Sequence, residues 1–193
     1  MRLFVALVPP EAAVEHLDAF LDVRRGAAAY RWATSEQFHV TLAFLAEVEE
    51  RRLDDLGERL QRAAARRTAF ETAIAGGGAF PNAGRARVLW AGLDLDEHGR
   101  TEIDRLATGT RAAANRAGIP VDGQRFRPHV TVARLGQPAE VSNWVRLLDG
   151  YAGPRWRADR ITLVASHLGE GPRGRPRYVN VDEFTLAEAP EVP

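Results

Sequence analysis

The sequence predicts an α+β protein with a pseudo-twofold duplicated, two-lobed fold. Two small antiparallel sheets are expected to line a central cleft, with helices outside. The first observation is a repeat: FHVTLAFL at residues 38–45 returns as PHVTVARL at residues 128–135. The second is that each copy ends a similar strand–helix–strand pattern. The third is that no G-x-G-x-x-G or P-loop motif lies at a strand–helix junction, which argues against a nucleotide-binding, doubly wound sheet.

The expected elements of the first half follow from apolar periodicity and turn residues. Pro9-Pro10 closes an apolar run, and Gly26 closes a stretch of helical spacing. In order, we expect a strand over 2–8, a helix over 11–25, a short extended piece over 30–32, a motif strand over 38–45 and a helix over 49–67.

The second half repeats this order. Residues 70–75 alternate like a strand that three glycines at 76–78 should break, and Gly118 closes a long helix. In order, we expect a strand over 87–95, a helix over 101–117, the second motif strand within 125–135, a short helix over 138–148, and final strands over 157–166 and 177–186.

The motif copies place four polar side chains on the sheet faces. In a strand, residues i and i+2 share one face, so His39 and Thr41 project together, as do His129 and Thr131. The apolar residues of the first copy are expected to face the core (Phe38, Val40, Leu42 and Phe44). The duplication should bring the two His/Thr pairs face to face across the pseudo-twofold axis.

Composition limits the possible functions. The 193 residues suit one domain, 1–193, with 187–193 as a flexible tail. Lys and Arg together number 26 and so do Asp and Glu, which argues against a broad basic surface for long nucleic acid. There is no cysteine and no lysine, so a cationic phosphate contact must come from arginine or histidine. No signal peptide or membrane-spanning run is expected, and the expected location is the cytoplasm.

The chemistry of the two pairs suits acid–base catalysis at a phosphate. A neutral imidazole can take a proton from water while a protonated one gives a proton to a leaving oxygen. Hydroxyls beside them can hold non-bridging phosphate oxygens, with no need for a metal or cofactor. A single His-x-Thr is usually a half-exposed surface pair; two copies in matching contexts favour catalysis. His16 and His98 are expected to be solvated.

The motifs and their flanks carry a family resemblance. HVTLAFL and HVTVARL resemble the H-x-T-x signatures, at 39–42 and 129–132, of the 2H phosphoesterase superfamily. The segments RLFVALVPPE, YRWATSEQFHVTLAFLAEV, FPNAGRARVLWAGL and RFRPHVTVARL resemble its RNA 2′,3′-cyclic phosphodiesterases, also called 2′-5′ RNA ligases, and SHLGEGPRGRPRYVNVDEF is a weaker match. Ala46 stands where this family often has glycine.

The resemblance implies a reaction and roles. It implies hydrolysis of RNA 2′,3′-cyclic phosphate ends to 2′-phosphomonoesters, with His39 as proton donor and His129 as proton acceptor. Thr41 and Thr131 would hold phosphate oxygens, and 2′-5′ joining would be a weak reverse reaction. The partners would be RNA ends or small cyclic nucleotides, bound by a monomer without an obligate protein partner.

Further residues are weaker candidates. Arg134 could supply charge to the phosphate, but simple alternation puts it on the face opposite His129, so this role needs a twist or bulge after Ala133. Arg125 and Arg127 could guide an RNA backbone, and His167 could touch substrate. Three aromatic residues could stack a base, although core packing is the commoner role of such residues (Trp32, Phe80 and Trp90).

Other functions stay open at this point. One is a phosphodiesterase for another small cyclic phosphate or a 2′-5′ oligonucleotide. Another is an RNA-end binding protein without turnover, which the two complete motifs disfavour. A histidine-based metal enzyme is disfavoured because neither motif carries a carboxylate at ligand spacing.

Overall fold

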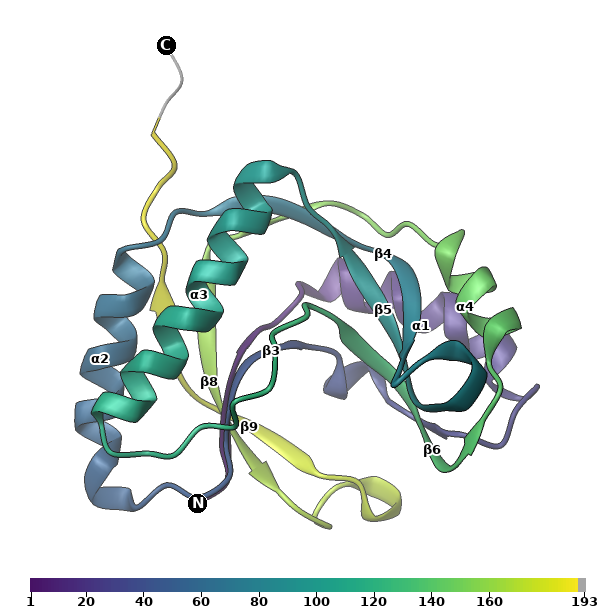
Figure 1. Ribbon diagram of the computed structural model, residues 1–193, viewed down its shortest axis with the longest axis horizontal. Coiled ribbons are helices and arrows are strands. Elements are labelled where there is room, and N and C mark those ends of the chain that lie inside the picture. Colours follow the sequence, from purple (N-terminus) through teal and green to yellow (C-terminus); the bar gives the residue numbers. More distant parts are fainter. Residues whose placement is uncertain (191–193) are drawn as a thin grey trace.

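The computed structural model, which describes residues 1–190, has the predicted α+β class (Figure 1). Four α-helices and nine strands follow one another along the chain. They are β1 (Leu3–Leu7), α1 (Glu11–Arg25), β2 (Arg31–Trp32), β3 (Val40–Leu45), α2 (Leu53–Ala65), β4 (Phe70–Phe80), β5 (Ala86–Asp94), α3 (Glu97–Arg116), β6 (Val130–Ala139), α4 (Ser142–Asp149), β7 (Trp156–Ala158), β8 (Arg160–His167) and β9 (Arg177–Thr185).

The strands form two antiparallel half-sheets that meet at one residue pair. Their order is β7-β4-β5-β6-β3-β1-β8-β9, with β2 also paired to β6. The contact between β6 and β3 consists of Val40 opposite Val130. Four strands lie on the β3 side of this junction and five, counting β2, on the β6 side, so the two expected sheets are joined into one continuous sheet at the pseudo-twofold axis.

Two helices, α1 and α3, each pack against the half-sheet that does not contain the strand preceding them in the chain. The α1 helix follows β1 in sequence yet packs against β4, and α3 follows β5 yet packs against β3. Figure 1 shows α2 and α3 together beside β3 and β8, with α1 and α4 near β4 and β5. The helix of each strand–helix–strand unit therefore covers the half-sheet that contains the strands of the other unit, and this packing holds the two lobes together.

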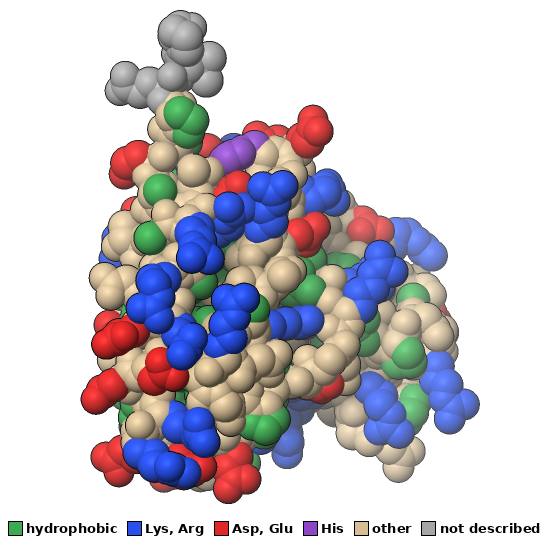
Figure 2. Space-filling model, turned by 60° about the vertical axis from the view of Figure 1, so that its left-hand side comes forward, with side chains coloured by type: hydrophobic (Ala, Val, Ile, Leu, Met, Phe, Trp, Pro, Cys, Tyr) green, Lys and Arg blue, Asp and Glu red, His purple; other side chains and the backbone are tan. Residues whose placement is uncertain are grey.

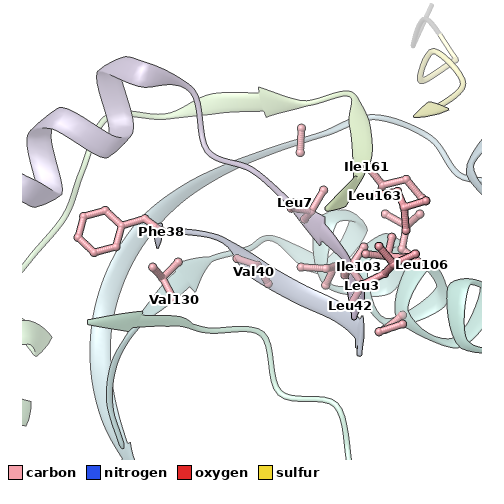
Figure 3. Packing of buried hydrophobic residues seen from close by; sticks show 14 of the residues in the cluster. Leu3, Leu7, Phe38, Val40, Leu42, Ile103, Leu106, Val130, Ile161 and Leu163 are labelled. Atoms are coloured by element: carbon pink, nitrogen blue, oxygen red, sulfur yellow. The ribbon is translucent and has the colours of Figure 1, made fainter. Parts of the chain in front are cut away.

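The hydrophobic core fixes the motif strands from behind. Val40, Leu42 and Val130 are fully buried, and Leu42 packs near Leu3 and Ile103 of α3 (Figure 3). Burying a side chain of this size stabilises the fold by about 1.5–3 kcal/mol. Such packing leaves these strands little freedom to rotate, so the polar residues between the core residues face away from it.

The glycine-rich stretch does not end β4, contrary to the expectation from sequence. The strand continues to Phe80, with a register shift between Ile74 and Gly77, and Gly76 has φ of +74°. A Cβ on Gly78 would overlap the Trp90 ring. Glycine is needed here because another element approaches the backbone closely, and the strand bends without breaking.

Several element ends also differ from expectation by a few residues, and contacts at two of these places are informative. The α3 helix begins at Glu97, four residues earlier than expected, because the Asp96 side chain caps it by accepting a hydrogen bond from the Gly99 amide at 2.7 Å. Ala187, the first residue of the expected tail, pairs with the rest of the fold: it bridges to Thr68, and its amide donates to the Arg67 carbonyl oxygen at 2.8 Å. The end of the predicted tail, residues 191–193, lies outside the described residues.

Candidate active site

The two His/Thr pairs lie together at the junction of the half-sheets. His39 and Thr41 flank Val40, and His129 and Thr131 flank Val130, the pair that joins β3 to β6. Because both valines are fully buried, their neighbours project to the opposite side. All four polar side chains line one cleft of about 470 Å³. We call it the central cleft. The arrangement expected from the repeat is present.

Each histidine is held by the same hydrogen bond. The Nδ1 of His39 donates to the Gln37 carbonyl oxygen at 2.7 Å, and the Nδ1 of His129 donates to the Arg127 carbonyl oxygen at 2.7 Å. A carbonyl oxygen can only accept, so Nδ1 carries the hydrogen in both rings. The Nε2 atoms are therefore left for proton transfer, and that of His39 lies 3.0 Å from the Thr41 hydroxyl.

The two imidazoles differ in their aromatic neighbours. Phe4 stacks on His39 with ring centroids 4.5 Å apart, and Tyr178 meets the same ring edge-on at 5.5 Å. His129 instead meets Phe80 edge-on at 4.9 Å and lies 6.0 Å from Trp90. The His39 ring is thus enclosed by flat apolar surface, and this breaks the symmetry of the pair.

Burial depresses the pKa values of both histidines. Desolvation lowers the pKa of His39 from 6.5 to about 4; the hydrogen bond to Gln37 opposes this, and the charges of His129 and Arg134 add to it. Desolvation also lowers the pKa of His129, against the hydrogen bond to Arg127, with Arg134 and Arg127 contributing. Both rings are therefore neutral at pH 7 when no anion is bound.

The central cleft is lined by positively charged side chains. Within the described residues, its lining includes four arginines and neither Asp nor Glu (Arg2, Arg31, Arg134 and Arg175). Two hydroxyl side chains besides the threonines also face it, Ser166 and Tyr178. Guanidinium groups and hydroxyls without a competing carboxylate suit a phosphate or phosphodiester anion.

Arg134 reaches the central cleft because of a β-bulge. Leu89 of β5 lies opposite Ala133 and the next residue, Trp90, lies opposite Thr131, so Val132 is an extra residue in β6. The bulge restores Arg134 to the side of His129 and Thr131. The condition for its role is thus met one residue earlier than expected, before Ala133.

The same irregularity occurs in the other motif strand and overturns one expectation. Val5 lies opposite Ala43 and Ala6 opposite Thr41, so Leu42 is the extra residue of β3. Phe44 consequently lines the central cleft, where its ring packs with Phe4, and it does not enter the main core. Simple alternation fails at Phe44 and Arg134 for one shared reason.

With the geometry established, similarity to known proteins identifies the family. A sequence profile described as the 2′-5′ RNA ligase superfamily matches residues 8–170, which include both motifs. The chain belongs to the 2′-5′ RNA ligase superfamily.

Individual relatives match three quarters or more of the chain. A Thermus thermophilus protein named RNA 2′,3′-cyclic phosphodiesterase is 34% identical over 96% of this chain and 90% of its own. An Archaeoglobus fulgidus protein of the same name is 35% identical over 76% and 80%. Among solved structures, TT0787 of Thermus thermophilus has a TM-score of 0.73 at 31% identity, covering 97% and 99% of the two chains. Escherichia coli LigT complexed with 3′-AMP has a TM-score of 0.77 at 25% identity, covering 97% and 98%.

The residues that the sequence marked as weaker candidates for substrate contact lie partly in the central cleft and partly outside it. Trp32 lines it, whereas Phe80 and Trp90 pack around His129. The Arg127 guanidinium lies over the Phe80 ring at 5.5 Å, and Arg127 acts on His129 through its backbone carbonyl. His167 is not part of the lining, and its Nδ1 lies 3.9 Å from Glu170.

The remaining histidines have partners of their own. The Nδ1 of His16, expected to be solvated, lies 2.9 Å from the Tyr151 hydroxyl. His98, which is exposed, has its Nε2 3.2 Å from the Thr68 hydroxyl. Neither ring reaches the central cleft.

Sequence reasoning missed several cleft residues. Phe4 sits within an apolar run and was indistinguishable from core, while Tyr178 and Arg175 lie in the weakly matching segment near the C-terminus. Arg175 donates to the Trp32 carbonyl oxygen at 2.8 Å, so the loop between β8 and β9 touches the opposite lobe. Long-range contacts of this kind leave no local pattern in the sequence.

Two searches for other features concern the described residues 1–190. No group of three or more His, Cys, Asp or Glu side chains is placed to hold a metal ion. No helix there combines the length and apolar character needed to cross a membrane.

Proposed function

We propose that the protein hydrolyses RNA 2′,3′-cyclic phosphate ends to 2′-phosphomonoesters. The observation that carries the proposal is the pair of identically anchored imidazoles in a cleft that is lined by arginines and, among residues 1–190, by no acidic side chain. The activity named for the Thermus and Archaeoglobus relatives supports it.

In the proposed reaction, His129 is the base and His39 the acid. Nε2 of His129 takes a proton from water as the water oxygen bonds to phosphorus. The bond from phosphorus to the ribose 3′-oxygen breaks, and Nε2–H of His39 gives its proton to that oxygen. Thr41, Thr131 and Arg134 bind the non-bridging oxygens, where negative charge increases in the transition state.

Because the pKa of His39 is depressed, this residue can act as an acid only if the bound substrate raises that pKa. An imidazole with a pKa of about 4 carries little charge at pH 7. A bound phosphodiester is an anion, and an anion within a few ångströms favours the protonated ring. Substrate binding is therefore expected to raise the pKa of His39, and the proposed roles require that His129 be the ring that stays neutral. The Thr41 hydroxyl lies 3.0 Å from Nε2 of His39 and can accept a hydrogen bond from Nε2–H until the leaving oxygen of the substrate replaces it.

The test is incubation of the pure protein with 2′,3′-cyclic nucleotides, with and without EDTA. We expect the 2′-monophosphate isomer and an unchanged rate with EDTA, because imidazoles, hydroxyls and guanidiniums supply the proton transfer and the charge. Loss of activity in EDTA that a divalent ion restores contradicts this mechanism. Formation of the 3′-isomer contradicts the assignment of the leaving oxygen.

Finer features of the proposal need separate tests. A substrate panel with other cyclic phosphates and 2′-5′ dinucleotides distinguishes the proposed substrate from related ones, and binding without turnover indicates an RNA-end binding protein. Weak 2′-5′ joining should appear as the reverse reaction at high concentrations of RNA ends. We also propose a monomer, which light scattering tests, and a cytoplasmic location, which fractionation tests.

A further inference from the structure

A second hollow lies on the outer surface between α2 and α3 and shares no residue with the central cleft. Its volume is about 400 Å³. We call it the arginine groove; Figure 2 shows arginine side chains gathered on the face of the molecule that carries these two helices. Its lining comprises Arg59, Arg62, Ala63, Arg66, Arg67, Asp104, Arg105, Thr108, Gly109, Ala112, Ala113 and Arg116.

The groove exists because small residues lie where the helices approach each other. A Cβ on Gly109 would be 3.7 Å from the Cβ of Ala63, so neither helix presents a large side chain there. Arg59, Arg62 and Arg66 follow one another at helical spacing on one wall. On the other wall Arg105 and Arg116 are eleven residues apart, about three turns or 16 Å along α3. The result is a shallow channel with a small-residue floor and guanidinium walls.

Its charge is unusual for a chain with no net charge. Within the described residues, six arginines line it beside one acidic residue, Asp104, although the whole chain has equal numbers of basic and acidic residues. Three of the six pair with acids: Arg59 with Asp55, Arg62 with Glu58 and Arg67 with Glu102.

The other three arginines lack such partners. Within residues 1–190, Arg66, Arg105 and Arg116 have no carboxylate within 4.0 Å, and all three are exposed. Like charges close together on a helix surface destabilise it, so a surplus concentrated in a concave site indicates an anionic ligand.

The residue types select a phosphate backbone as that ligand. Guanidiniums bind phosphates with paired hydrogen bonds, and Thr108 adds a hydroxyl. Within residues 1–190 no aromatic side chain lines the groove, so it lacks the aromatic platform on which single-stranded bases usually stack, and the phosphates are the part of the strand that its residues suit. A channel several turns long suits successive phosphates of one strand. We propose that the arginine groove binds the phosphodiester backbone of RNA, as a site separate from the central cleft.

The choice of RNA over other polyanions rests on the proposed function at the central cleft. An enzyme that acts on the end of an RNA chain meets a strand with many further phosphates. A backbone site that ignores sequence would raise the affinity for long RNA and leave the turnover of a mononucleotide unchanged. The predicted signature is thus a dependence of KM on RNA length.

The test compares two triple variants with equal charge change. The groove variant is Arg66→Gln/Arg105→Gln/Arg116→Gln. The control is Arg85→Gln/Arg100→Gln/Arg146→Gln, which removes three exposed arginines that also lack a carboxylate within 4.0 Å in the described part of the chain and lie outside the groove. The probe is a labelled single-stranded RNA of about twenty nucleotides ending in a 3′-phosphate, followed by fluorescence anisotropy across a salt series.

We expect the groove variant to bind this RNA at least tenfold more weakly at low salt, with the control within threefold of wild type. The slope of log affinity against log salt should fall by about two, since each lost contact to single-stranded nucleic acid removes roughly 0.7. For an RNA ending in a cyclic phosphate, KM should rise with little change in kcat. Turnover of a cyclic mononucleotide should stay within twofold in both variants.

Several outcomes overturn the proposal. Unchanged RNA binding, or equal weakening in both triple variants, removes the specific role of the groove. Loss of binding to phosphatidylserine vesicles with RNA binding intact assigns the groove to a membrane surface instead. Thermal unfolding checks that both variants are folded, and Arg105→Gln alone, in mid-helix, should still weaken RNA binding about threefold. The binding measurement needs no turnover, so it decides the groove even if the wild type fails to hydrolyse cyclic phosphates.

Discussion

Phe44 and Arg134 occupy equivalent positions, five residues after His39 and His129, and a one-residue bulge turns each of them into the central cleft. The duplicated backbone thus presents an apolar ring on one side and a guanidinium on the other. Next to Phe44 the positive charge comes instead from Arg2, which precedes β1. The guanidinium carbon of Arg2 lies 4.4 Å from the centroid of the Phe44 ring. The two halves share the same bulge in the backbone but differ in the side chain that the bulge places in the central cleft.

Arg134 should matter for both binding and pH dependence. Arg134→Gln should lower kcat/KM about 10–10²-fold, because a hydrogen bond from a charged donor to the phosphate is lost. It should also move the pH profile upward, because the positive charge of Arg134 lowers the pKa of both histidines. Arg125→Gln is the matched control, since Arg125 is exposed, does not line the central cleft and is not among the charges that lower the pKa of either histidine. A reduced rate with an unmoved pH profile would contradict the predicted effect of the Arg134 charge on the histidines.

The threonines are expected to act through their hydroxyl groups. Thr41→Ala and Thr131→Ala should each weaken transition-state binding by about 1–3 kcal/mol, measured as kcat/KM. Thr→Ser at either position should keep much of the activity. Thr41→Ala should also alter the His39 limb of the pH profile, because the Thr41 hydroxyl contacts Nε2 of His39 at 3.0 Å. Serine variants as damaged as the alanine variants would mean that the methyl group, through packing, is what matters.

The pH profile of kcat/KM should lie on the acid side of the ordinary histidine range. This parameter reports groups of the free enzyme. Both histidine pKa values are lowered there, that of His39 to about 4, so the singly protonated pair becomes scarce as pH rises above about 6.5. The profile of kcat should be displaced to higher pH, because the bound anion favours the imidazolium. Superimposable profiles of kcat and kcat/KM would contradict this role of the substrate.

Leaving-group replacement should separate the roles of the histidines. His39→Ala and His129→Ala should each lose about 10²–10⁴-fold in rate, and the double variant should be little worse than the poorer single one. A cyclic phosphate analogue with a thiolate or aryl-oxide leaving group in place of the 3′-oxygen needs no proton from an acid. It should restore His39→Ala and leave His129→Ala inactive. Restoration of His129→Ala alone would reverse the assignment of acid and base.

Much of the site was predictable because a strand has a strict local period. His39 and Thr41 share a face whatever the surroundings, and the repeat at His129 and Thr131 implied a second copy of the same surface. The junction at Val40 and Val130 then joined the pairs as the duplication suggested. The α+β class followed in the same way from helical and strand periods read along the chain.

The sequence by itself therefore determined the class of fold, the family and the four polar residues that face one another. Only the tertiary structure decided where the two-residue alternation of the motif strands is interrupted. The extra residues Leu42 and Val132 depend on how each strand pairs with its neighbour, and this pairing brings Phe44 and Arg134 into the central cleft. Likewise the exchange of α1 and α3 between lobes and the stacking of Phe4 on His39 join residues distant in the chain. Local periodicity carries no record of such contacts, because packing between elements sets them.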